Sequence, residues 1–135
     1  MILIVCVDDH NGMMFNHRRQ SQDRVLRADI LELTDGKKLW MNAYSRKQFA
    51  ESDAEKILVD ETFLDAAGDG EFCFVENADV SGCVERIEEI YLYRWNRDYP
   101  ADVYFPVDLS VWKCVETKEF AGSSHEKITR ERYTC

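Results

Sequence analysis

The sequence has no long apolar run. Its longest such run, residues 1–7, has the length of a strand and ends at Asp8 and Asp9. A helix that crosses a membrane needs about 20 apolar residues, so no membrane span is expected. The same run lacks the basic start and the small-residue cleavage site of a signal peptide. We therefore expect a cytoplasmic protein.

Paired cysteines and metal-binding motifs are also missing. The five cysteines are an odd number without a C-x-x-C pair, and the three histidines form no H-E-x-x-H or similar spacing. No Walker loop, G-x-S-x-G elbow or G-x-G-x-x-G fingerprint is present. Cys6, Cys73 and Cys114 fall within apolar strand patterns and predict reduced core thiols, whereas Cys135 is expected to be exposed.

Positive charge is scarce. The chain has 17 Lys and Arg residues against 26 Asp and Glu residues, which gives a formal net charge of −9. Affinity for a nucleic-acid backbone depends on positive charge, so general nucleic-acid binding is not expected. With 135 residues, 45% of them hydrophobic, the chain is long enough to bury a core and fits one domain, residues 1–135.

The patterns that are present alternate between strands and helices and then become consecutive strands. Early strands are predicted over residues 2–7, 38–42, 56–59 and 71–75. Helices are predicted over residues 23–34 with Ser21 as N-cap, from Ser45 to about residue 51, and from Asp60 to Gly68. Residues 8–22 are predicted to be a polar loop. Late strands are predicted over residues 90–95, 103–105 and 112–116, with a last edge strand over 128–133. This order indicates an α/β domain with a mixed β-sheet flanked by short helices.

Several local motifs together resemble one family. Residues 90–112 read IYLYRWNRDYPADVYFPVDLSVW, and WKCV stands at 112–115. Asp102, Phe105, Pro106 and the WKCV stretch resemble the D-x-x-F-P and W-K-x-V strands at the end of dihydrofolate reductases. The opening VDDHNGMM and the stretch LELTDGKKLWMN are similar to the first loop, the T-x-G-K turn and the Met-Gly strand of that family. The resemblance implies a shortened and divergent dihydrofolate reductase-like fold.

The resemblance also implies where NADPH would bind, and three parts of that site differ. The family has an R-x-T element after Met-Gly, but this chain reads MNAYS, and only Ser45 keeps the hydroxyl. The segment that holds the adenosine end is missing. The glycine pair after the strand at 71–75 is replaced by Glu76 and Asn77, and a carboxylate there would repel a pyrophosphate. We expect no cofactor bound in the family's manner, and a rearranged NADPH site is the alternative.

The family places an acid at the start of its first long helix, where the acid contacts the pterin and assists protonation. Asp23 matches that position best. As a general acid in a pocket, Asp23 would have a pKa raised toward neutrality by burial. As an ordinary first-turn acid, it would stabilise the helix by about 0.5 kcal/mol. The threonine of the family's L-x-T strand is Tyr93 here.

Residues 16–27 concentrate basic side chains ahead of a helix N-terminus. Guanidinium groups and free backbone amides at such a place can bind phosphate or carboxylate. The alternatives are a solvated loop, whose arginines pair with Asp8, Asp9, Asp29 or Glu32, and a protein contact. His17 is a candidate for proton transfer, although an isolated loop histidine is more often incidental. The candidate catalytic residues are Asp23 and His17. The candidate ligand-binding residues are Asn16, Arg18, Arg19, Gln20, Arg24, Arg27, Tyr44, Ser45, Glu76, Asn77 and Tyr93.

Four functions follow from these patterns. The leading hypothesis is a non-redox protein that binds a small anionic or nucleotide-like ligand through residues 16–27. The second is a divergent NADPH-dependent pterin or folate reductase with Asp23 as its acid. The third is a metal-independent phosphoester hydrolase or ribonuclease that uses His17, Arg18, Arg19 and Asp23, and the fourth is a protein interaction module.

Overall fold

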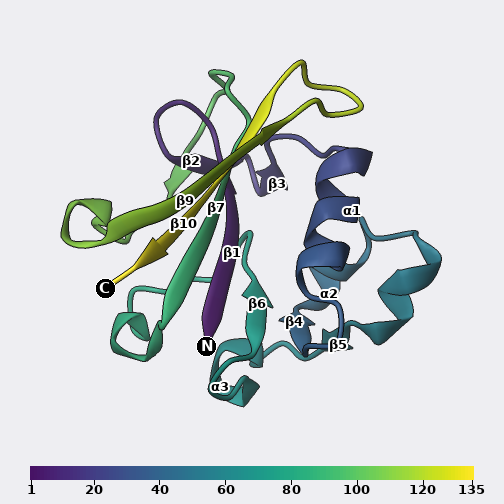
Figure 1. The fold of residues 1–135 in the computed structure, drawn as a ribbon, viewed down its shortest axis with the longest axis vertical. Helices are drawn as coiled ribbons and strands as arrows, with labels where there is room; N and C mark the ends of the chain where they lie inside the picture. The colour runs from purple at the N-terminus through teal and green to yellow at the C-terminus, as the bar shows by residue number, and fades with distance from the viewer.

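The computed structural model describes residues 1–135, the side chain of Ser52 excepted, and contains a seven-stranded sheet and a three-stranded sheet. The large sheet has the order β5-β4-β6-β1-β7-β10-β9 (Figure 1). Its strands are β1 (Ile2–Val7), β4 (Leu39–Met41), β5 (Leu58–Val59), β6 (Phe72–Phe74), β7 (Glu89–Arg94), β9 (Lys113–Phe120) and β10 (Ile128–Thr134). The strands β5, β4, β6, β1 and β7 run parallel, and β10 is antiparallel to both β7 and β9. The predicted α/β domain with a mixed sheet is confirmed.

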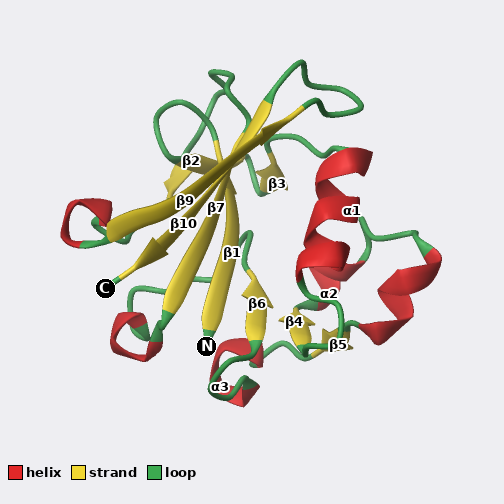
Figure 2. Cartoon of the chain, viewed as in Figure 1, coloured by secondary structure: helices red, strands yellow, loops and turns green.

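The apolar strand β1 lies in the middle of this sheet because both of its faces are covered. Leu3 and Val5 pack into one core cluster, and Ile2 and Ile4 pack into a second cluster on the other face. The second cluster includes Leu26 and Ile30 of helix α1 (Arg24–Leu33). Figure 2 shows α1 alongside the large sheet. A continuous β-branched run is typical of a strand buried in this way.

The start of α1 differs from the prediction. Asp23, not Ser21, is the N-cap, and its side chain accepts hydrogen bonds from the backbone N–H groups of Val25 and Leu26. Asp23 has an extended backbone, which is typical of an N-cap residue. The helix ends at Thr34, and Gly36 follows with a φ of 75°, which favours glycine.

The predicted polar loop over residues 8–22 is wrong, because it contains a β-hairpin. Strands β2 (Gly12–Phe15) and β3 (Arg18–Arg19) pair antiparallel, and β8 (Val103–Tyr104) joins β2 from the other side. The two residues between β2 and β3 are Asn16 and His17, and both have positive φ values, 50° and 61°. Two left-handed residues in succession make the tight turn whose twist suits a hairpin. Hence the hairpin projects His17 and Arg18 from its tip.

Other differences concern helix starts and the sheet edge. Helix α2 (Ala43–Arg46) is capped by Asn42 rather than Ser45, and α3 (Phe63–Ala66) begins after Thr62 rather than Asp60. Three 3-10 helices complete the elements: η1 (Ser52–Lys56), η2 (Val84–Arg86) and η3 (Leu109–Val111). The last strand, β10, is internal, because β9 forms the edge.

The cysteine predictions are partly confirmed. All five cysteines are free. Cys73 is buried, and burial raises the pKa of its thiol to about 12. Cys6 is half-buried and Cys135 is exposed, but Cys114 is also exposed, contrary to the prediction, because it lies on the edge strand β9. Within the described residues, no helix has the length and apolar character that a membrane crossing requires.

Candidate functional site

The hairpin β2–β3 lies over the carboxyl ends of β4 and β6, held there by an ion pair. Arg19 in β3 donates from Nε and Nη2 to both carboxylate oxygens of Glu76, at 2.9 and 3.1 Å. Both side chains are largely buried, with exposed fractions of 20% and 10%. A bidentate guanidinium–carboxylate pair in such surroundings is among the stronger polar contacts in proteins. The two residues were both predicted to bind ligand, and they bind each other.

Two further contacts tie the same strand ends together. The guanidinium of Arg19 lies 4.4 Å from the centre of the Tyr44 ring, and the Tyr44 hydroxyl accepts a 2.8 Å hydrogen bond from the backbone N–H of Arg19. The Asn42 amide donates to the Asn77 side-chain oxygen at 2.8 Å. Since Glu76 and Asn77 follow β6 directly, the carboxyl end of this strand is filled by side chains of the protein itself.

Two hollows flank the hairpin. The first, of about 420 Å³, is lined by Met14, His17, Asn77, Asp102 and Val103. The second, of about 270 Å³, we call the hairpin hollow; it is lined by Phe15, Asn16, Arg18, Arg19, Gln20, Tyr99 and Pro100. The structure thus brings four predicted ligand-binding residues of the 16–27 segment into one hollow, and it places His17 with Asn77 in the other.

The hairpin hollow offers one cation that has no ion-pair partner among the described residues. Arg18 is exposed and forms no ion pair with any residue that the structure describes. The side-chain nitrogen of Gln20 donates to the Asp8 carboxylate at 2.9 Å and to the Pro100 carbonyl at 3.3 Å. Both partners are acceptors, so the amide orientation is fixed. The Gln20 Oε1 atom is buried and has no hydrogen-bond partner among the described residues.

Asp23 is a buried carboxylate surrounded by donors from two segments. Besides the first turn of α1, it accepts hydrogen bonds from the backbone N–H groups of Ser123 and Ser124, at 3.0 and 2.8 Å, and lies 3.0 Å from Nδ1 of His125. These residues belong to the loop between β9 and β10. The loop approaches so closely that a Cβ atom on Gly122 would collide with the Asp23 carboxylate. Asp23 therefore fastens this loop to the helix.

The electrostatics of Asp23 differ from those predicted for a general acid. Burial alone would raise its pKa, but the hydrogen bonds from Ser124, Ser123 and His125 outweigh burial and hold the pKa well below the usual range. Such a carboxylate has no proton to give near neutral pH. The catalytic role of Asp23 as an acid stays a prediction, and this geometry does not favour it.

The lowered pKa of Asp23 makes stability depend on pH. An aspartate in an unfolded chain has a pKa of about 3.9, and the folded value is lower, so the unfolded chain binds more protons in acid. The stabilising contribution is complete above the unfolded pKa and is lost as the pH falls toward the folded one. We expect urea unfolding to show a free energy that decreases below about pH 4, with a shallower decrease in Asp23→Asn. Equal slopes in the two proteins would contradict this.

A second buried carboxylate, Asp29 on α1, was not predicted as a site residue. The Tyr93 hydroxyl donates to Asp29 at 2.5 Å, and Arg130 and Lys118 donate to it at 2.7 and 2.8 Å. Burial would raise the pKa of Asp29, but these partners lower it. Its partners come from β7, β9 and β10, which lie far from Asp29 in the sequence. The only sequence feature that could have indicated this site is an acidic residue on the apolar face of a helix.

The remaining candidate residues lie outside the hollows. Tyr93 is fully buried, and Ser45 is buried with an unpaired hydroxyl among the described atoms. Arg27 pairs with Glu51 at 2.8 Å rather than with Asp29 or Glu32. Arg24 is exposed and does not line the hairpin hollow. The arginines of the 16–27 segment therefore point to different places.

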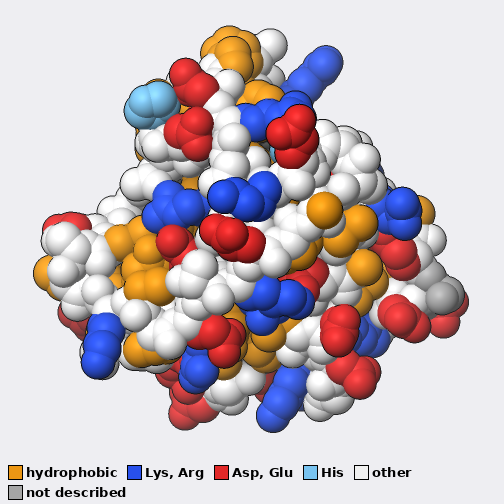
Figure 3. Space-filling model, turned by 45° about the horizontal axis from the view of Figure 1, so that its top comes forward, with side chains coloured by type: hydrophobic (Ala, Val, Ile, Leu, Met, Phe, Trp, Pro, Cys, Tyr) orange, Lys and Arg blue, Asp and Glu red, His pale blue; other side chains and the backbone are white. Residues whose placement is uncertain are grey.

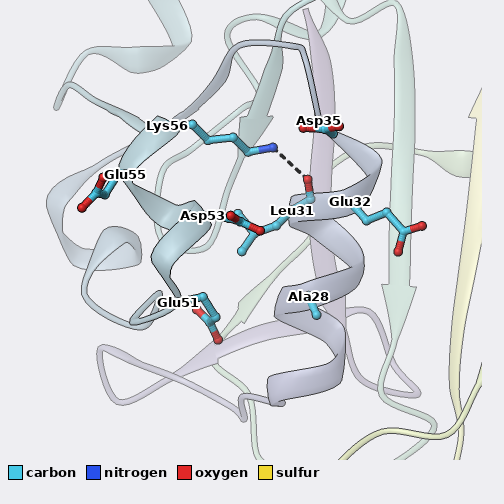
Figure 4. A pocket seen from close by; sticks show the side chains of 8 residues that line it. All are labelled: Ala28, Leu31, Glu32, Asp35, Glu51, Asp53, Glu55 and Lys56. Atoms are coloured by element: carbon cyan, nitrogen blue, oxygen red, sulfur yellow. Dashed lines mark hydrogen bonds between the residues drawn. The ribbon is translucent and has the colours of Figure 1, made fainter.

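A cavity of about 600 Å³ lies between α1 and η1, and acidic side chains dominate its lining. Five carboxylates line it, and its lysine donates to the Leu31 carbonyl at 2.8 Å (Figure 4). The lining residues are Ala28, Leu31, Glu32, Asp35, Glu51, Asp53, Glu55 and Lys56. Carboxylates repel an anionic ligand, so this acidic groove does not serve an anion.

Charged side chains of both signs are mixed on the outer surface. Figure 3 shows Lys and Arg side chains interleaved with Asp and Glu side chains over the face it displays, without a continuous basic patch. The face displayed in Figure 3 therefore lacks the continuous positive charge that binding of a long phosphate backbone depends on.

Comparisons with known proteins identify the fold. No protein-family model matches the chain, and the curated proteins give no match either. Among solved structures 242 chains match, so the likeness does not depend on a single structure. One of them is dihydrofolate reductase from Enterococcus faecalis complexed with NADP(H) and RAB-propyl, with a TM-score of 0.68 and 16% sequence identity. The match covers 98% of this chain and 94% of that chain. The predicted dihydrofolate reductase-like fold is confirmed.

Proposed function

We propose that this chain is a non-redox member of the dihydrofolate reductase-like fold that binds a small anionic, nucleotide-like molecule in the hairpin hollow. The observation that carries the proposal is the unpaired guanidinium of Arg18 beside the rings of Phe15 and Tyr99 in one hollow of about 270 Å³. This volume lies near the lower end of ligand pockets and suits one heterocycle or a short acid.

The chemistry of the lining selects the ligand class. Arg18 favours a phosphate or carboxylate, because a guanidinium matches either group with two hydrogen bonds. Phe15, with an exposed fraction of 48%, and Tyr99 supply flat apolar surfaces. A flat heterocycle that carries an anionic substituent meets both requirements.

The filled strand end supports the view that NADPH is not held as in the reductases. The Arg19–Glu76 pair and the Asn42–Asn77 hydrogen bond occupy the carboxyl end of β6. A dinucleotide there would have to break a buried ion pair and face an unpaired carboxylate, which costs several kcal/mol. The enterococcal reductase is complexed with NADP(H), whereas this chain carries the ion pair.

The geometry gives less support to the other functions. The reductase hypothesis needs a protonated Asp23, but its carboxylate is fully hydrogen-bonded and its pKa is lowered. The phosphoester hydrolase hypothesis needs His17 beside Arg18 and Asp23. His17 lines the first hollow, Arg18 the hairpin hollow, and Asp23 is buried under the β9–β10 loop.

Thermal shift and calorimetric titration with mononucleotides, inorganic phosphate, folate and NADPH test the proposal. We expect a mononucleotide to raise the melting temperature and NADPH to have no effect. Arg18→Ala should weaken mononucleotide binding about 10-fold or more, since a charge-assisted hydrogen bond contributes about 1.5–3 kcal/mol.

Arg24→Ala is the matched control. It removes an exposed arginine of the same segment that does not line the hairpin hollow. We expect its affinity to equal that of the unmodified protein. Equal losses in Arg18→Ala and Arg24→Ala, or stoichiometric NADPH binding, would contradict the proposal.

A further inference from the structure

A buried histidine joins a serine and an aspartate in one hydrogen-bonded row. His125, in the loop between β9 and β10, has an exposed fraction of 4% and stacks on Trp95 with ring centres 4.6 Å apart. Its Nδ1 lies 3.0 Å from the Asp23 carboxylate, and its Nε2 lies 3.1 Å from the Ser21 hydroxyl. Packing and hydrogen bonding thus fix both the position and the orientation of the imidazole.

The surroundings fix the tautomer of the ring. The Asp23 carboxylate receives only donors, from backbone N–H groups and the Ser124 hydroxyl as well as from His125. Nδ1 must therefore carry a proton and donate it to Asp23. In the neutral ring, Nε2 then has a free electron pair, directed at the Ser21 hydroxyl. This is the arrangement in which an imidazole can remove a proton from a serine.

Ser21 is partly exposed, so solvent reaches part of this residue. It lies in the segment between β3 and α1, directly after Gln20, which lines the hairpin hollow. The backbone N–H groups of Ser21 and Gln22 have no hydrogen-bond partner among the described residues. Backbone N–H groups beside a nucleophile are the usual donors to the oxyanion of acyl transfer.

We propose that Ser21 is a nucleophile, with His125 as its general base and Asp23 as the residue that positions the imidazole, and that the protein hydrolyses small carboxylic esters. The inference goes beyond the proposed ligand binding and does not rest on it, because a small neutral ester needs no anion site. The row does not overlap the ion pair that fills the carboxyl end of β6, and it uses neither His17 nor Arg18.

The reaction has two balanced halves. Ser21 Oγ attacks the ester carbonyl carbon while its proton moves to His125 Nε2, and the backbone N–H groups stabilise the oxyanion. The carbon–oxygen bond to the alcohol then breaks, the alcohol leaves with the proton from Nε2, and an acyl-serine remains. Water then attacks the acyl carbon and gives a proton to Nε2. The bond between this carbon and Ser21 Oγ breaks, and Oγ takes the proton from Nε2. The sum is ester plus water giving acid plus alcohol.

Tyr99 distinguishes this role from a purely structural one. Its hydroxyl lies 3.0 Å from the same Nε2 atom, so two hydroxyls share one electron pair. Tyr99→Phe removes the competitor and leaves Nε2 to Ser21 alone. We expect the reactivity of Ser21 to increase several-fold in this variant, whereas a hydroxyl that only fastens the loop would gain nothing.

Labelling of the full-length protein with a neutral alkyl fluorophosphonate, read by intact mass and peptide mapping, tests the proposal. We expect one label, on Ser21, and a burst of nitrophenol from p-nitrophenyl acetate. His125→Gln should slow labelling by about 100-fold or more, the typical contribution of a general base. Ser21→Ala should abolish both signals, and its melting temperature reports whether it folds.

The matched control is Ser110→Ala. The Ser110 hydroxyl is also hydrogen-bonded to a carboxylate, Asp108 at 2.7 Å, but it is exposed and has no imidazole partner in the described structure. This variant should label as the unmodified protein does. The proposal is overturned by a label on another residue, by no label at all, by unchanged labelling in His125→Gln, or by no gain in Tyr99→Phe.

Discussion

Replacing Asp23 by alanine is expected to lower the free energy of unfolding by about 3–5 kcal/mol. The substitution removes the N-cap of α1, which contributes about 1 kcal/mol. It also leaves the backbone N–H groups of Ser123 and Ser124 and the buried ring of His125 without their acceptor. A buried donor left unpaired, such as the His125 ring, costs about 1–3 kcal/mol, and the partly buried N–H groups of Ser123 and Ser124 add a smaller loss, so the loop and the helix lose stability together. Urea unfolding followed by circular dichroism measures the change.

The control for Asp23→Ala is Asp60→Ala. The Asp60 carboxylate also accepts two hydrogen bonds, from the backbone and the hydroxyl of Thr62 at 2.8 Å each, but both bonds are exposed to solvent. Water replaces both bonds there, so the loss should be much smaller. Equal destabilisation by the two substitutions would mean that the number of hydrogen bonds, and not their burial, determines the effect.

Much of the fold could be predicted because it depends on local patterns. The apolar run of residues 2–7 indicates a strand covered on both faces, and the spacing of Leu26, Ile30 and Leu33 indicates an amphipathic helix. The order of the motifs that resemble dihydrofolate reductases then indicated how the strands and helices are connected. The hairpin could not be predicted from the sequence because its turn, Asn16-His17, lacks the glycine that usually marks two successive left-handed residues. Serine and aspartate are both common N-cap residues, so the sequence could not decide between Ser21 and Asp23. Contacts with the β9–β10 loop place Asp23 at the N-cap.

The site could be predicted less well because its contacts join distant segments. The segment 16–27 does contribute four residues to one hollow, as its composition suggested. The sequence could not show that Arg19 is bound to Glu76, 57 positions away, or that His125 lies beside Asp23. Contacts of this kind depend on the order of the strands in the sheet. The spacing of residues within one segment gives no information about that order. An anion site inferred from arginine content therefore has to be reduced to the arginines that line the hollow without an ion-pair partner, here Arg18.

Replacing Asp29 by alanine is expected to be as costly as replacing Asp23, for a different reason. Asp29 neutralises Arg130, whose side chain has an exposed fraction of 13%, and accepts the hydrogen bond of the fully buried Tyr93. Removing one partner of a buried ion pair leaves an uncompensated charge, which costs about 3–5 kcal/mol. Lys118 is about half exposed, so water can solvate it after the change.

A double substitution separates the value of the ion pair from the cost of breaking it. In Asp29→Leu/Arg130→Met both charges are gone, and an apolar contact of similar volume can replace them. We expect this protein to recover much of the stability lost in Asp29→Leu alone, with a coupling of about 1–3 kcal/mol in urea unfolding. Glu119→Ala removes the exposed partner of Lys127, which directly precedes β10. This substitution should cost no more than about 1 kcal/mol. Additive effects of Asp29→Leu and Arg130→Met would contradict the view that this buried pair acts as a unit.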